Sequence, residues 1–284
     1  MAVVSHKYRR VLMWFLLTLL FAGLVYAGAE LMGQTNKNAA DAGSTGADME
    51  MASLDSIKQS KSNPVNWSEE QRLHKKINAL DSEYKTHVNK ARSEATSAGS
   101  VSAGTRSAGI ACAERYQQAC EDYASFWDKN NGKTRARLAR ETGKSRVANA
   151  QMTFNDADAS RISAYNDQQE ALAKARKEYL SEAKTDVSDA DRASIKSSLQ
   201  PRLNKMTGEV QNLISSVTSL LDQVRSQAGG MGVGAIGGCA KSVATGGGAA
   251  GGASALLSPV TNLLSLAKSL GSNVTSMLSD IQAL

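Results

Sequence analysis

The stretch LNKMTGEVQNLISSVTSLLDQV, residues 203–224, places an apolar side chain at alternating spacings of three and four residues. A second stretch, VTNLLSLAKSLGSNVTSMLSDIQAL, covers residues 260–284 with the same spacing. This is the a/d repeat of helices that pack along a seam, so both stretches are predicted to be amphipathic helices. The seam positions are Leu203, Met206, Val210, Leu213, Val217, Leu220 and Val224, then Val260, Leu263, Ala267, Leu270, Val274, Met277, Ile281 and Leu284.

The two heptad helices have matched predicted limits. Pro201 and Pro259 suit the first position of a helix, which predicts helices over 201–226 and 259–284 with a connector over 227–258. Helices of equal length could form an antiparallel hairpin within the chain. Few charges flank the seam to select a partner, so pairing between chains is equally open.

The connector is rich in glycine, with eleven glycines between residues 229 and 252. Because each glycine disfavours a helix in water by about 1 kcal/mol relative to alanine, a loop is expected there. Gly230, Gly234 and Gly238 nevertheless form a repeated G-x-x-x-G pattern, which allows helices to approach closely in a membrane. The segment therefore reads either as a loop or as a membrane-inserting or assembly hairpin.

The N-terminus carries the apolar stretch VLMWFLLTLLFAGLVYAGA, residues 11–29, after a basic tail at 1–10. As a helix it would be roughly 28 Å long, enough to cross a bilayer, and the basic residues would stay in the cytoplasm. This predicts a single-pass protein of the bacterial inner membrane whose bulk is periplasmic. Ala27-Gly28-Ala29 also fits a signal-peptide site, so cleavage after Ala29 and secretion is the alternative.

The composition predicts an all-α chain. Aromatic residues make up 5% of it, prolines number three, and no strand-like alternation stands out. Residues 30–66 are rich in Gly, Ala, Asn and Ser and are expected to form a polar linker, with Ser68 beginning the next helix. Residues 67–200 are predicted to form polar, coiled-coil-like helices, interrupted by a loop at 97–109, that pack as a hairpin or as a long stalk.

Cys112, Cys120 and Cys239 leave one thiol unpaired if a disulfide forms. In an oxidising compartment Cys112 and Cys120 could pair, but on one continuous helix they would lie about 12 Å apart, which is too far. A bridge therefore requires a bend between them. The aromatic side chains between 116 and 127 are expected to pack helix against helix, and Cys239 is expected to be a small buried residue.

The net charge is +6, from 33 basic and 27 acidic residues, and part of the excess is concentrated in one segment. It could be a solvated helix face, or it could bind anionic lipid or an acidic partner. Nucleic acid is an unlikely partner, because no aromatic residue lies between the basic ones. The basic residues are Lys133, Arg135, Arg137, Arg140, Lys144 and Arg146.

Motifs of known chemistry do not emerge. The Gly-Lys-Ser and Gly-Lys-Thr tripeptides at 143–145 and 132–134 lack the earlier glycine of a phosphate-binding loop. The three histidines have no metal-ligand spacing, and there is no C-x-x-C or G-x-S-x-G motif. We therefore expect no enzyme activity, cofactor or metal.

The run Asn38-Ala39-Ala40-Asp41-Ala42 follows the apolar stretch closely. In this position it resembles the start of Tad/Flp-type pilus-assembly proteins of the pseudopilin-like kind, over about residues 11–52. The resemblance implies an envelope protein with one membrane helix and an extracytoplasmic domain. No prepilin-type cleavage site precedes the apolar stretch, and no functional residue carries over.

Together these patterns favour a membrane-anchored, non-enzymatic protein that assembles through its heptads as part of a pilus, secretion or conjugation apparatus. Its partners would be the membrane and either further copies of the chain or other envelope proteins. One alternative is a membrane-perturbing protein, spanin-like or pore-forming, that uses the glycine-rich hairpin. Another is a surface binding module that uses residues 133–146.

Overall fold

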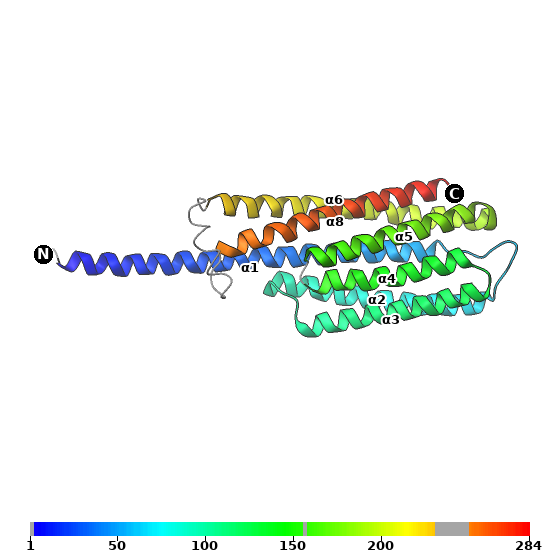
Figure 1. Cartoon of the computed structure of the whole chain (residues 1–284), viewed down its shortest axis with the longest axis horizontal. Helices are drawn as coiled ribbons and strands as arrows, with labels where there is room; N and C mark the ends of the chain where they lie inside the picture. The colour runs from blue at the N-terminus through cyan, green and yellow to red at the C-terminus, as the bar shows by residue number, and fades with distance from the viewer. Residues whose placement is uncertain (1–2, 156–157, 231–249) are drawn as a thin grey trace.

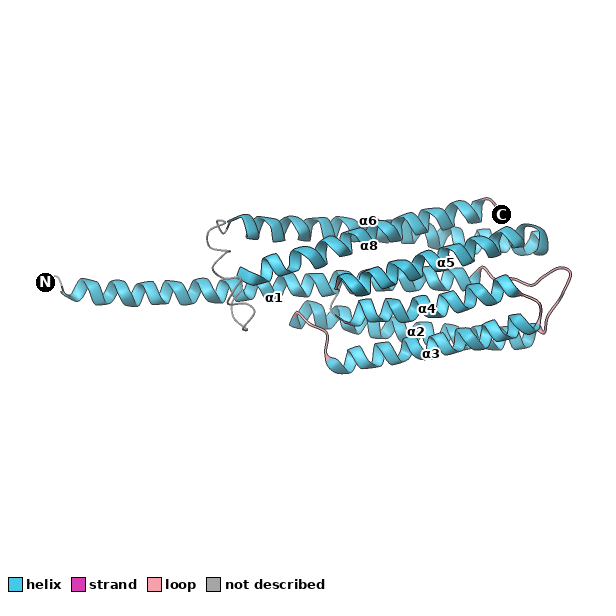
Figure 2. Cartoon of the chain, in the orientation of Figure 1, coloured by secondary structure: helices cyan, strands magenta, loops and turns pink. Residues whose placement is uncertain are grey.

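Helices make up nearly all of the chain that the computed structural model describes, which is residues 3–155, 158–230 and 250–284 (Figure 2). Side chains are described for residues 29–155, 158–226 and 257–284. No strand occurs in these ranges, so the all-α prediction is confirmed. The helices are α1 (Val3–Asp55), α2 (Trp67–Ala98), α3 (Ala103–Lys129), α4 (Lys133–Phe154), α5 (Ala159–Asp186), α6 (Asp189–Gly230) and α8 (Ala250–Gln282).

The helices lie side by side along one long axis, and successive helices run in opposite directions (Figure 1). α1 is the shared neighbour, because it packs against α2, α4, α6 and α8. α3 packs against α2 and α4, while α5 packs against α4 and α8. The first half of α1 projects beyond the end of this bundle (Figure 1). One helix thus forms both the projecting stem and the centre of the bundle.

The expected linker over residues 30–66 is mostly helix, because α1 continues to Asp55. Small residues let α1 approach its neighbours closely: Ala40 and Ala47 have no exposed surface. A Cβ atom added at Gly46 would lie 1.9 Å from the Tyr165 hydroxyl. Glycine and alanine here serve close helix packing, so the prediction of a polar linker was wrong for residues 30–55.

Residues 67–200 pack as part of the bundle rather than as a stalk. α2 begins after Asn66, whose side chain accepts a hydrogen bond from the Glu69 amide at 3.3 Å, so the expected start at Ser68 was one residue late. The expected loop over 97–109 shrinks to the few residues between Ala98 and Ala103, with Gly99 in the left-handed conformation (φ 73°).

The C-terminal heptads form a hairpin within the chain. α6 and α8 pack along their length, α6 ends at the same end of the bundle at which α8 begins, and the seam residues from Leu203 to Val224 and from Val260 to Ile281 are buried (Figure 1). Neither proline begins its helix. Ile195 and Leu199 extend the buried stripe before Pro201, and this packing carries α6 through the proline.

No helix among the residues with described side chains is long and apolar enough to cross a membrane. The predicted span at 11–29 lies almost entirely outside those residues, since side chains are described only from residue 29 onward. The path of α1 through this stretch is helical.

Candidate functional site

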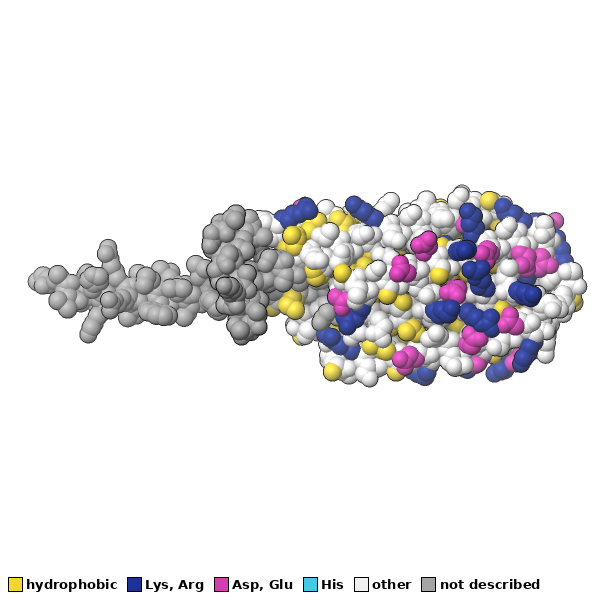
Figure 3. Space-filling view, viewed as in Figure 1, with side chains coloured by type: hydrophobic (Ala, Val, Ile, Leu, Met, Phe, Trp, Pro, Cys, Tyr) yellow, Lys and Arg dark blue, Asp and Glu magenta, His cyan; other side chains and the backbone are white. Residues whose placement is uncertain are grey.

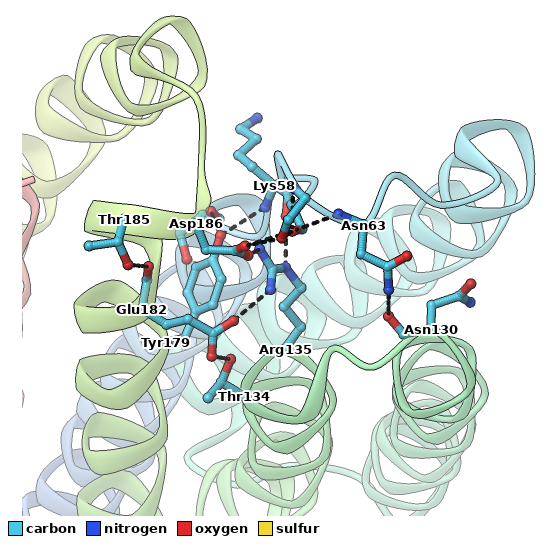
Figure 4. A network of polar contacts seen from close by, with 12 residues as sticks. Lys58, Asn63, Asn130, Thr134, Arg135, Tyr179, Glu182, Thr185 and Asp186 are labelled. Carbon is cyan, nitrogen blue, oxygen red and sulfur yellow. Dashed lines mark hydrogen bonds and ion pairs between the residues drawn. The ribbon is translucent and has the colours of Figure 1, made fainter.

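The end of the bundle opposite the projecting stem is closed around Arg135 of α4 (Figure 4). The Arg135 side chain is 2% exposed. Its guanidinium donates to Glu182 at 2.8 Å, to Asp186 at 2.7 Å and to the Lys58 carbonyl at 2.8 Å. The guanidinium carbon also lies 5.4 Å from the centre of the Tyr179 ring, within range of a cation–π contact. Arg135 therefore joins α4, α5 and the segment after α1.

Asp186 is the second centre of this cluster. Its carboxylate accepts hydrogen bonds from Arg135 and, at 2.6 Å, from the Ser60 hydroxyl, while its carbonyl accepts the Lys61 amide at 2.7 Å. Burial alone would raise the pKa of the Asp186 carboxyl, but the Ser60 hydroxyl and the Arg135 guanidinium together hold that pKa below its ordinary value. These groups form hydrogen bonds with one another, so the cluster holds α4, α5 and the segment after α1 together.

A second charged cluster lies inside the bundle around Arg146 of α4. Arg146 and Glu50 of α1 form an ion pair, and the side chains of both are 0% exposed. Arg146 also donates to Asp81 of α2 at 2.8 Å. Its guanidinium carbon lies 4.5 Å and 4.1 Å from the ring centres of Tyr84 and Tyr116. Ser145 donates to the same Glu50 carboxylate at 2.8 Å, so the buried charges are paired, while the Arg146 Nη1 atom has no hydrogen-bond partner among the described residues.

The basic segment 133–146 is only in part a surface feature. Two of its six cations, Arg135 and Arg146, are buried, and carboxylates pair with three of the others. The pairs are Arg137 with Glu178, Arg140 with Glu121 and Asp128, and Lys144 with Glu141. Lys133 is exposed. The visible face carries basic and acidic side chains side by side (Figure 3). The solvated-face interpretation holds for Lys133, Arg137 and Lys144, which are exposed, but not for the buried Arg135 and Arg146, and the binding-surface interpretation stays a prediction.

A cleft of about 650 Å³ lies where the end of α1 meets α2 and α6. Asp55 lines it and pairs with Arg202 and, at 3.2 Å, with His74. Burial alone would raise the pKa of the Asp55 carboxyl, but His74 and Arg202 together lower it. Trp67, 42% exposed, lies at the same cleft. Asp55, His74 and Arg202 already pair with one another in this cleft, which favours a structural role for them.

Glu83 and His87 of α2 and Cys112 of α3 form a small cluster of metal-ligand side chains. Their ligand atoms all lie within 4.8 Å of one another. The His87 Nε2 atom is 3.7 Å from Glu83 Oε1. Spacing rules for histidine alone miss the trio because it joins two helices. The four-residue spacing of Glu83 and His87, which puts both on one helix face, was the available signal.

The structure answers the question of a Cys112–Cys120 disulfide, which the sequence left open. Cys112 and Cys120 are buried on the unbroken α3 and are free thiols, so the bend that a disulfide requires is missing. Burial raises the pKa of the Cys112 thiol to about 11. The aromatic residues between them and beyond pack in the core, as expected: Tyr116, Tyr123 and Trp127 are each at most 1% exposed.

The glycine pattern of the connector falls mainly outside the described residues. Gly230 is the last residue of α6, whereas Gly234, Gly238 and Cys239 lie in the part of the chain that the structure does not describe. The expected loop or inserting hairpin thus stays a prediction. Comparisons with protein-family models, curated proteins and solved structures found no match to this chain.

Proposed function

We propose that the chain is a membrane-anchored, non-enzymatic envelope protein and a structural component of a pilus, secretion or conjugation apparatus. One observation carries the proposal: α1 runs without a break from Val3 to Asp55. The apolar stretch 11–29 and the packed centre of the bundle therefore belong to the same helix. An anchor of this kind would hold the bundle in a fixed orientation at the membrane surface.

The structure changes the expected route of assembly. The heptad residues are buried within the chain, so Leu213 and Leu270 are unavailable to a second copy. A charge at either position would unfold the hairpin whether or not the protein assembles. Contacts with other envelope proteins would instead use the mixed polar outer faces of the bundle (Figure 3).

Membrane fractionation tests the anchor. Leu16→Lys combined with Leu20→Lys places two charges in the apolar stretch, at a cost of roughly 2.5–3.5 kcal/mol each for insertion. We expect the wild type to stay with the membrane through alkaline carbonate washing and this variant to be released. The Leu16→Ala and Leu20→Ala double variant is the matched control. Release of the wild type itself would refute the anchor.

A deletion strain tests the structural role. We expect loss of filaments, secretion or conjugative transfer, restored by the wild type but not by the Leu16→Lys, Leu20→Lys variant. Unchanged filaments, secretion and transfer in the deletion strain would refute this role and leave the anchor result standing.

A membrane-perturbing function is the second candidate. The end of α6 and the start of α8 lie at the same end of the bundle as the projecting part of α1 (Figure 1). Under the proposed anchoring, the ends of the glycine-rich connector would face the bilayer. Leakage of dye from anionic vesicles treated with the full chain, abolished by Gly234→Leu, would support this function. Absence of leakage would exclude it.

A further inference from the structure

The cluster of Glu83, His87 and Cys112 lies outside every contact that the proposed function uses. Glu83 and His87 share one face of α2, and Cys112 reaches them from the neighbouring α3, which packs against α2. Both helices are capped, α2 by Asn66 and α3 by Ser102, so the three side chains extend from firmly placed backbone.

The three side chains match the preferences of one class of ion. A cysteine that releases its thiol proton to water on binding, an imidazole and a carboxylate are the three ligand types of zinc, and three protein ligands leave one position for water. In tetrahedral zinc sites the ligand atoms lie roughly 3.3–3.6 Å apart, as bond lengths of about 2.0–2.3 Å require. The 4.8 Å spread of this cluster therefore needs a contraction of about 1 Å, which side-chain rotation can supply.

Arg115 competes for the same carboxylate. Its Nη2 atom donates to Glu83 Oε1 at 2.6 Å, and its side chain is 56% exposed. An exposed ion pair of this kind contributes little to stability, so Arg115 can turn into water when a cation binds Glu83. We propose that Glu83, His87 and Cys112 form a binding site for a zinc-like divalent ion, and that Arg115 occupies its carboxylate ligand when the ion is absent.

Cobalt(II) titration of the full chain in detergent tests the site directly, because a Co²⁺–thiolate bond gives a charge-transfer band in the near ultraviolet. The protein carries Cys239→Ser, so that its thiols are confined to α3. We expect one equivalent of Co²⁺ to produce this band and Zn²⁺ to abolish it by displacement. Cys112→Ser should remove the band, while Cys120→Ser, a change at the other buried thiol of the same helix, should preserve it.

Substituting His87 or Glu83 and substituting Arg115 should change the affinity for Co²⁺ in opposite directions. His87→Gln and Glu83→Gln should each weaken Co²⁺ binding at least tenfold, by comparison with the 10–100-fold losses seen when groups that merely support metal ligands are removed. Arg115→Gln should tighten binding. His74→Gln is the control for a histidine elsewhere on α2. Circular dichroism checks that each variant keeps its helices.

Two results would overturn the proposal. One is a wild-type titration without the charge-transfer band. The other is a band that survives Cys112→Ser in folded protein, because the thiolate would then come from elsewhere. Neither result depends on membrane anchoring or on the deletion phenotype, so the site can fail while the proposed function stands.

Discussion

Arg146 lies in the middle of α4 with its charge enclosed by Glu50, Asp81 and two tyrosine rings. Arg146→Met keeps much of the side-chain volume but leaves Glu50 buried without its cation. We expect a loss of about 3–5 kcal/mol in the free energy of unfolding, measured by urea denaturation.

Lys144→Met is the matched control for this prediction. Lys144 lies two residues away on the same helix and pairs with Glu141 at the surface, so its loss should cost less than about 0.5 kcal/mol. Adding Glu50→Gln to Arg146→Met should restore part of the stability, because the buried charge is then gone. Equal losses in Arg146→Met and Lys144→Met would contradict the role assigned to the cluster.

Asp186 gives the stability of the protein a definite dependence on pH. Because its pKa is lower in the folded chain than in the unfolded one, its contribution is present above the unfolded pKa of about 3.8 and disappears as the pH falls through the folded value. Asp186→Asn should therefore cost about 1–2 kcal/mol at pH 6, and the difference from wild type should shrink towards pH 3. Urea denaturation at both pH values measures this.

Asp189→Asn serves as the control, because Asp189 pairs only with Arg192 in the structure and is 86% exposed. It should change stability little at either pH. A constant difference between wild type and Asp186→Asn from pH 6 to pH 3 would argue that the carboxylate charge plays no part.

The partners of the buried arginines could not be predicted from the sequence. Segment 133–146 looks like a basic patch because its compensating acids are far away in sequence: Glu50, Asp81 and Asp186 lie between 51 and 96 residues from their arginines. Local charge counts cannot find such partners. The aromatic residues of α3, whose burial depends on helical spacing alone, were predicted correctly.

The glycines of α1 and α6 differ in how closely other residues pack against them. A Cβ atom at Gly46 of α1 would overlap the Tyr165 hydroxyl, whereas a Cβ atom at Gly208 of α6 would meet no atom within 4 Å. We expect Gly46→Ala to destabilise the protein by about 1–3 kcal/mol through overpacking, and Gly208→Ala to stabilise it by about 0.5–1 kcal/mol through helix propensity. Thermal unfolding followed by circular dichroism compares them. A stabilising Gly46→Ala would mean that α1 packs less closely than described.

The same contrast explains which elements could be predicted. The heptads of α6 and α8 carry large aliphatic side chains at regular spacing, and that signal is strong. The second half of α1 carries alanine, glycine and serine, which suit a linker as well as a close helix contact. Its burial depends on Asn149, Thr153 and Tyr165 of α4 and α5, which local sequence cannot reveal.

The pairing of α6 with α8 can be tested on the whole molecule. A Cβ atom at Gly271 would lie 3.1 Å from Val210 Cγ1, so Val210→Cys with Gly271→Cys should form a disulfide within one chain. Non-reducing electrophoresis should show a shifted monomer and no dimer. Val217→Cys with Val274→Cys should not bridge within a chain, because the antiparallel register separates these positions by roughly 15 Å. A dimer band in the first variant would instead favour pairing between chains.

The packing of the helices into one bundle could not be predicted from the sequence. Helices 67–200 carry thin apolar stripes and many charges, which is typical of exposed stalks as well as of helices around a shared centre. What decides between them is α1, which offers a buried face to α2, α4, α6 and α8 at once. Because that role was hidden in the expected linker, these helices were predicted to form a hairpin or a long stalk rather than a packed bundle.

The unbroken α1 has a mechanical consequence. Its 53 residues form a rod of roughly 80 Å with no joint between its ends. Membrane helices tilt by about 20° on average, and a change of that size at Val3 would sweep Asp55 sideways by roughly 27 Å. With α1 anchored, the bundle would move with this stiff helix. A small change in the tilt of α1 in the bilayer would therefore displace the far end of the bundle by a large distance.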